Sequence, residues 1–413
     1  IYSTERVHEE LCEAAVQALP GLCQADPALV SEIRQKLEAM VKERRSLCRA
    51  AVKALSELCL IDATIVPEIY PLFKSVMDQR GGDETEAGFI RAVLVSLPAF
   101  YRADSTLAPE ILAWFRTIVM DPTAPLCLRR NAVRTLTMLS QARSTTVLEV
   151  LPWLGELLPD TNVDERLRSD IVGTLPALCK INPEIAPHVF QFLYNLVTDQ
   201  RTSQGIRALA VQNLPEVCQA APTVVSHAYQ LFRTIMRQQP ATPFSRSVIS
   251  FLPKLCQVDR TLTSEVYKLL LSLVNNSREN QEARENATSA LAELCQADAT
   301  RVPQIWPILK RYVESQREDS GLRKKATKGL YQLCQIDASV FPQIWPSVQT
   351  IINNSNEDFE LRQEVIDELI ALRRLDTLPA LEIRAQLQFI VDNPRESERL
   401  KQTARGALEA LGP

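Results

Sequence analysis

Cysteine and histidine, the side chains that most often hold metals or do redox chemistry, form no recognisable site in this sequence. The 413 residues include ten cysteines and three histidines. No two cysteines have the C-x-x-C spacing of zinc and dithiol sites. His188 and His227 are 39 residues apart, and on stacked helices they would lie roughly 10 Å from each other, too far to share a metal ion. We therefore expect no metal and no cofactor.

Sequence motifs of catalysis are not found either. The sequence has no G-x-x-x-x-G-K-[ST], no G-x-G-x-x-G, no H-E-x-x-H and no G-x-S-x-G. We predict that the chain is not an enzyme. The formal net charge is −4, which lacks the basic excess of a general nucleic-acid binder. No run of 18 apolar residues occurs, so we expect no membrane span.

The cysteines are explained by a repeat. The segment Leu-Cys-Gln-Ile-Asp around Cys334 recurs along the chain at intervals of 36 to 42 residues, most of them 39. Seven cysteines occupy the same place in it: Cys23, Cys59, Cys179, Cys218, Cys256, Cys295 and Cys334. Eleven copies of this marker fill the sequence, so we expect residues 1–413 to form a single repeat domain.

Each repeat contains two amphipathic segments that read as α-helices. The segment that ends at the marker places Ala326, Leu330, Leu333 and Cys334 on one helical face. Its leucine is present in every copy: Leu19, Leu55, Leu97, Leu136, Leu175, Leu214, Leu252, Leu291, Leu330, Leu369 and Leu408. A second segment follows the marker aspartate, which suits a helix N-cap. The short link predicts antiparallel helix pairs.

The unit from Ile305 to Leu330, with a proline in its first helix and Leu322-Arg323 opening its second, resembles a HEAT repeat. The resemblance covers essentially the whole chain and implies an all-α, armadillo-like right-handed α-α superhelix. First helices would lie on the convex side and second helices on the concave side. We expect an N-terminal orphan helix and about ten hairpins, at residues 27–60, 63–102, 105–142, 144–181, 183–220, 222–258, 260–297, 299–336, 338–375 and 377–413.

A column of arginines opens the second helices, and two interpretations remain open. Each arginine could satisfy turn carbonyls in a structural ladder, or the column could bind anions of a partner. Its members are Arg129, Arg168, Arg207, Arg284, Arg323 and Arg362. Cys12, Cys48, Ile90 and Ser245 replace the basic residue, so we expect weaker ladders in repeats 1 to 3 and 7.

The concave face of repeats 2 to 6 is the candidate functional surface, because its outward positions are rich in small and apolar residues with sparse charges. Such a groove suits a helix or an extended peptide. The candidate partner-binding residues are Lys53, Glu57, Val95, Ala99, Arg134, Met138, Gln212 and Glu216.

We therefore predict a monomeric, non-enzymatic protein-interaction scaffold with a protein or peptide partner. The alternatives are a HEAT-type nucleic-acid-binding module, or the regulatory region of a larger protein whose catalytic domain lies outside this segment. Many unpaired buried cysteines favour a reducing, intracellular and cytoplasmic location.

Overall fold

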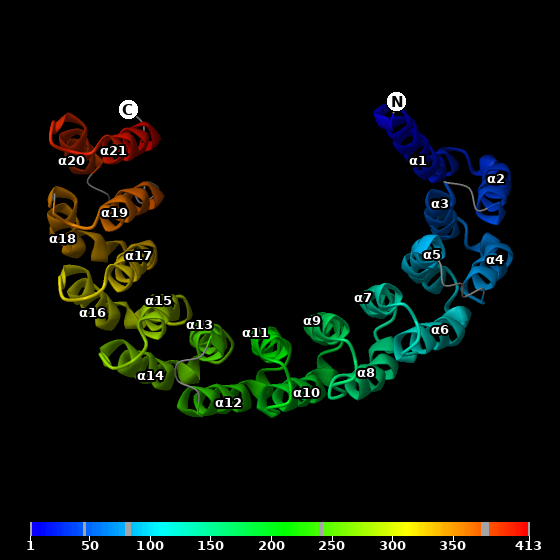
Figure 1. The fold of residues 1–413 in the computed structure, drawn as a ribbon, viewed down its shortest axis with the longest axis horizontal. Helices are drawn as coiled ribbons and strands as arrows, with labels where there is room; N and C mark the ends of the chain where they lie inside the picture. Colours follow the sequence, from blue (N-terminus) through cyan, green and yellow to red (C-terminus); the bar gives the residue numbers. More distant parts are fainter. Residues whose placement is uncertain are drawn as a thin grey trace. The chain divides into compact units, whose positions relative to one another are not determined.

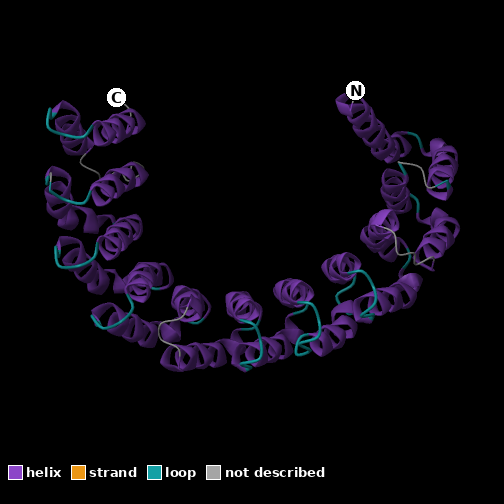
Figure 2. Cartoon of the chain, in the orientation of Figure 1, coloured by secondary structure: helices purple, strands orange, loops and turns teal. Residues whose placement is uncertain are grey.

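The structure is a computed structural model that describes residues 2–43, 47–78, 84–238, 243–354, 356–372 and 380–411. Over these ranges the regular secondary structure consists of α-helices and short 3₁₀ turns (Figure 2). The chain divides into two compact units, Ile1–Ala220 and Ala221–Pro413. Each unit is a layered stack of helix pairs, and each is described by itself. The prediction of one continuous domain with ten hairpins stays a prediction.

The first unit has two rows of helices (Figure 1). The inner row contains α1 (Tyr2–Ala25), α3 (Cys48–Ile61), α5 (Glu84–Ala103), α7 (Leu126–Ala142), α9 (Glu165–Ile181) and α11 (Gln204–Ala220). The outer row contains α2 (Val30–Lys42), α4 (Val66–Asp78), α6 (Ala108–Met120), α8 (Thr146–Leu157) and α10 (Ala186–Thr198). Successive helices of the inner row pack against one another. The sides of these helices that face away from the outer row, here called their outward sides, therefore form a continuous surface.

The second unit repeats the same two-row arrangement. Its inner row contains α13 (Pro243–Val258), α15 (Gln281–Ala297), α17 (Ser320–Ile336), α19 (Phe359–Ala371) and α21 (Glu398–Leu411). Its outer row contains α12 (Val225–Gln238), α14 (Thr263–Asn275), α16 (Val302–Glu314), α18 (Phe341–Asn353) and α20 (Ala380–Asp392).

The marker aspartate caps a helical element, as predicted, although the element is a single 3₁₀ turn that leads into the outer helix. The Oδ1 atom of Asp62 accepts from the backbone N–H of Thr64 at 2.9 Å. The hydroxyl of Thr64 also donates to this carboxylate, and these bonds lower the pKa of Asp62. The same backbone bond is made by Asp26, Asp104, Asp259, Asp298 and Asp337.

The repeated leucine and the marker cysteine form the core of both units. Leu55, Leu97 and Leu214 are fully buried, whereas Leu19 and Leu408 are half-buried. Leu19 lies in α1, which has a neighbour on only one side of the inner row, so less of its surface is covered. The seven marker cysteines are buried free thiols, as predicted. Burial raises the pKa to about 12 at Cys59, Cys179, Cys218, Cys256, Cys295 and Cys334.

Candidate partner-binding surface

The eight predicted residues lie on the outward side of the inner row of the first unit. They form pairs four residues apart on α3, α5, α7 and α11. In each pair one residue lies two positions before the repeated leucine and the other two positions after it. Both are therefore turned about 160° from that buried side chain. Glu57 and Ala99 are half-buried, and the other six residues are exposed. The pairs on α3, α5 and α7 are brought together on neighbouring helices, whereas α9 separates them from the pair on α11.

Apolar side chains are left open to solvent on this surface. Val95 on α5 is 47% exposed and Met138 on α7 is 42% exposed. Leu60 on α3 is 50% exposed, beyond the predicted pair of that helix. Single exposed apolar residues are ordinary on a protein surface, but these three lie on successive helices of one face, where a partner would bury them.

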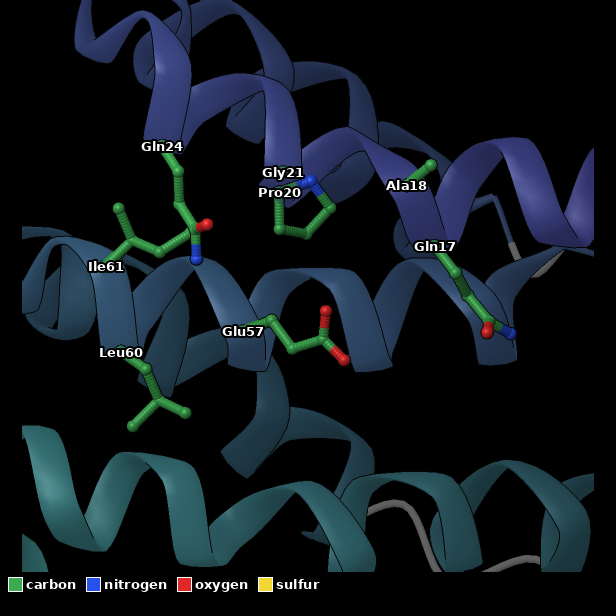
Figure 3. A pocket seen from close by; sticks show the side chains of 8 residues that line it. All are labelled: Gln17, Ala18, Pro20, Gly21, Gln24, Glu57, Leu60 and Ile61. Carbon is green, nitrogen blue, oxygen red and sulfur yellow. The ribbon is translucent and has the colours of Figure 1, made fainter.

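A groove lies at the N-terminal end of this surface, between α1 and α3, and has a volume of about 460 Å³. Figure 3 shows Pro20 and Gln24 of α1 facing α3, which contributes Glu57 and Leu60. A Cβ atom added at Gly21 would meet nothing within 4 Å, so the groove is open at that point. The complete lining is Gln17, Ala18, Pro20, Gly21, Gln24, Glu57, Leu60 and Ile61.

Charged side chains on the surface are held in place from neighbouring helices. The guanidinium of Arg134 donates to Oδ1 of Asp170 on α9 at 2.9 Å, and Arg130 donates to the same carboxylate. Burial alone would raise the pKa of Asp170, but the hydrogen bonds from Arg130 and Arg134 outweigh it and lower the pKa. Glu216 accepts from Lys180 at 2.7 Å. Both partners of that pair are largely exposed, so it contributes little to stability.

Three cations on the same surface escaped the sequence reasoning. Arg49, Arg91 and Arg130 each lie six residues before the repeated leucine of α3, α5 and α7. Arg49 and Arg91 are exposed and Arg130 is half-buried. The spacing could have predicted these three arginines, because each lies four residues, or about one helical turn, before Lys53, Val95 or Arg134 and therefore on the same side of its helix.

The arginine column forms a structural ladder, which confirms the first of the two interpretations, whereas the binding of a partner's anions by this column stays a prediction. The Nε of each arginine donates to the carbonyl oxygen ten residues earlier, near the end of the outer helix, at 2.9–3.1 Å. These carbonyls belong to the last turn of a helix and have no partner within it. The acceptors are Val119, Leu158, Val197, Val274, Val313 and Ile352.

The prediction of weaker hydrogen-bond ladders in repeats 1 to 3 and 7 falls partly on turns that lie outside the described residues. Residues 44–46, 79–83 and 239–242 lie outside the described ranges. At the arginine position of α5 the structure has Ile90, which is buried and has no side-chain donor to offer a carbonyl.

No protein-family model and no curated protein matches the sequence. Among solved structures, the crystal structure of Kap121p has a TM-score of 0.62 at 13% identity, over 97% of this chain and 43% of that chain. Kap121p bound to the extreme C-terminus of the protein phosphatase Cdc14p gives the same TM-score and identity, over 97% and 44%. Importin beta in an ammonium sulfate condition has a TM-score of 0.50 at 14% identity, over 97% and 55%. The chain has the fold of a HEAT-type α-solenoid. It spans about half the length of these structures.

No group of three or more His, Cys, Asp or Glu side chains in the described part of the solenoid could hold a metal ion. Among the described helices, none is long and apolar enough to cross a membrane.

Proposed function

We propose that this HEAT-type solenoid is a non-enzymatic scaffold that binds a peptide or a helical segment of a protein partner along the inner row of its first unit. The observation that carries the proposal is that successive helices of one face each expose an apolar side chain, Leu60 on α3, Val95 on α5 and Met138 on α7. Their burial by a partner would be favourable by about 25 cal/mol per Å² of apolar surface. The groove between α1 and α3 extends this face toward the N-terminal end.

The solved structures with this fold support a protein partner. Kap121p is bound to Nup53p in one of them and to the extreme C-terminus of Cdc14p in another. The present chain covers 43–44% of those proteins. We further propose that the chain acts as a monomer in the reducing cytoplasm, where its ten free thiols would stay unpaired.

The test replaces a small residue on the proposed surface with a long charged one. A display library of peptides is selected against the wild-type chain, and the affinity of each selected peptide is then measured by fluorescence anisotropy. Ala99→Arg would place a guanidinium among Val95 and Met138, where a bound partner would bury it without a counterion. We expect binding to weaken by at least about tenfold, a change of 1.4 kcal/mol.

The control is Glu149→Arg, on the exposed side of α8 in the outer row. We expect it to leave binding unchanged. Both variants should keep their stability within about 0.5 kcal/mol of wild type, because neither changes the core. Loss of binding in Glu149→Arg with full binding in Ala99→Arg would place the partner on the outer row instead.

A further inference from the structure

Three neighbouring inner helices of the first unit present cations at two successive turns. The earlier turn carries Arg49 on α3, Arg91 on α5 and Arg130 on α7, and the later turn carries Lys53 and Arg134, with Val95 between them. We call these five cations, Arg49, Lys53, Arg91, Arg130 and Arg134, the basic grid. Neighbouring helices in such a row are roughly 10 Å apart, so the fields of the five charges overlap at physiological ionic strength, where the Debye length is about 8 Å.

The carboxylates within reach do not balance the basic grid. Glu13 lies 3.9 Å from Arg49, and Glu57 lies 4.0 Å from Lys53. Asp170 is shared between Arg130 and Arg134. Asp164 also acts on Arg130 electrostatically. Among the described residues, four carboxylates therefore face five cations, and Arg91 forms no ion pair with a described side chain. This positive excess is confined to the basic grid, whereas the chain as a whole has a net charge of −4.

Apolar side chains lie directly beside the basic grid. Val95 stands within its later turn, and Ala99 and Met138 follow one turn further along α5 and α7. A partner on this face would therefore meet cations on one side and apolar surface on the other. Complementary charge speeds encounter and fixes the register of a bound segment, while the apolar contacts retain it.

We propose that the face formed by the basic grid with Val95, Ala99 and Met138 binds an acidic segment of a protein partner that also carries apolar side chains. This inference rests on the proposed function and adds the chemistry of the partner. A nucleic acid fits the face less well. Glu57 interrupts the positive charge beside Lys53, and the exposed apolar side chains on these three helices include no aromatic ring on which a base could stack.

Three labelled probes are compared by fluorescence anisotropy on the full chain. The first is a peptide of about 12 residues containing Glu, Asp and Leu, which extends to roughly 40 Å and can cross the three helices. The second has Lys in place of every acidic residue. The third is a single-stranded oligonucleotide of similar length. We expect binding of the acidic peptide only, weakening between about 0.05 and 0.5 M salt as exposed charges are screened.

Charge reversal then tests whether the basic grid is responsible. In Arg49→Glu/Arg91→Glu we expect the acidic peptide to bind at least about tenfold more weakly, because two attractions become repulsions. The basic peptide should now bind the variant, which a merely misfolded chain would not do. The matched control, Arg143→Glu/Arg201→Glu, makes the same charge change at exposed loop positions of the same unit and should bind the acidic peptide as wild type does.

The possible outcomes separate the two proposals. If peptides from the library bind in an Ala99-dependent way while the acidic peptide does not bind, the scaffold function stands and the acidic partner is refuted. Equal loss in the control variant would also refute it, because the effect would then follow net charge alone. If only the oligonucleotide binds, and the reversal at Arg49 and Arg91 abolishes that binding, the face is a nucleic-acid site and both proposals fail.

Discussion

The two units of the solenoid use the same arginine ladder but complete it differently. In the second unit the guanidinium also reaches a glutamate of the next turn, in the pairs Arg284–Glu318, Arg323–Glu357 and Arg362–Glu396, at 2.5–2.9 Å. In the first unit the equivalent positions hold Val163 and Thr202, both buried. The Nη2 atom of Arg168 is buried with no hydrogen-bond partner among the described residues. A buried ion pair therefore joins successive turns in the second unit, whereas in the first unit Arg129 and Arg168 interact with Asp164 and Asp199 of the next turn through longer-range electrostatics.

The inner rows of both units carry ion pairs between neighbouring helices, such as Arg134–Asp170 and Lys180–Glu216 in the first unit. In the second unit Lys324 pairs with Glu360 across α17 and α19. Burial raises the pKa of Glu293, although the nearby Lys254 opposes that shift. In the first unit the basic grid keeps an excess of positive charge beside exposed apolar residues. The same repeat pattern therefore joins neighbouring inner helices by ion pairs in both units, and in the first unit it also leaves cations beside exposed apolar residues.

The largest expected effect that separates the units is the loss of a ladder arginine. Arg323 and Glu357 have side chains only 7% and 8% exposed. In Arg323→Ala the buried carboxylate of Glu357 loses its counterion, which costs about 3–5 kcal/mol. Arg168→Ala leaves only the carbonyl of Leu158 without its bond, at about 1–3 kcal/mol. Urea unfolding of both variants measures the difference, and equal losses would contradict the distinction between the units.

A core substitution should affect the two units alike. Leu214→Ala in α11 and Leu330→Ala in α17 each remove a buried side chain and should cost about 2–5 kcal/mol. Because repeats contact only their neighbours, the loss of hydrogen-exchange protection should concentrate in adjacent helices, such as α9 and α10 for Leu214→Ala. Uniform loss along the chain would show that the core does not behave as a stack of repeats.

The ion pairs of the second unit should make it sensitive to acid. Hydrogen bonds from Arg323 and Arg362 lower the pKa of Glu357 and Glu396. Their stabilisation is therefore complete above the unfolded pKa of about 4.3 and is lost as the pH falls through the lower, folded pKa. Glu357→Gln should cost about 1–3 kcal/mol at pH 7, and the difference from wild type should shrink towards pH 3. Urea unfolding at several pH values checks this, and a difference that does not change with pH would argue against it.

The rate at which the cysteines are alkylated should differ clearly between the two units, while replacing an exposed cysteine should have the smallest effect on stability. Cys127, at the start of α7, is exposed, and Cys12 and Cys48 are half-buried; all three lie in the first unit. Near pH 8 a thiol with a pKa of about 12 is ionised in roughly one molecule in 10⁴, and the thiolate is the reactive form. Rapid alkylation followed by peptide mapping should label the first unit alone. Cys127→Ser should change stability by no more than about 0.5 kcal/mol. Fast reaction of seven or more thiols would contradict the burial of the marker cysteines.

Much of the surface prediction rested on the position of one leucine. Placing residues relative to Leu55, Leu97 and Leu136 correctly predicted that Lys53, Val95 and Arg134 are turned away from the core. Arg49 and Arg91 were not among the predicted residues, although they lie one helical turn before Lys53 and Val95. How far a side chain one turn earlier is exposed depends on how the neighbouring helix packs, and the sequence spacing alone does not fix that.

The sequence by itself determined the repeat, the two helices of each repeat, the buried leucine and cysteine, and the aspartate cap. These follow from local rules, namely the 3.6-residue period of apolar residues and the hydrogen bond from a capping carboxylate to a nearby N–H group. The tertiary structure decided which carbonyl each ladder arginine meets, which turns gain a glutamate partner, and that five cations share one face. The arginine–carbonyl bonds depend on how the two helices of one repeat meet, ten residues apart in the chain. The other two features depend on distances between helices 34 to 40 residues apart, which are set by the packing of the stacked repeats.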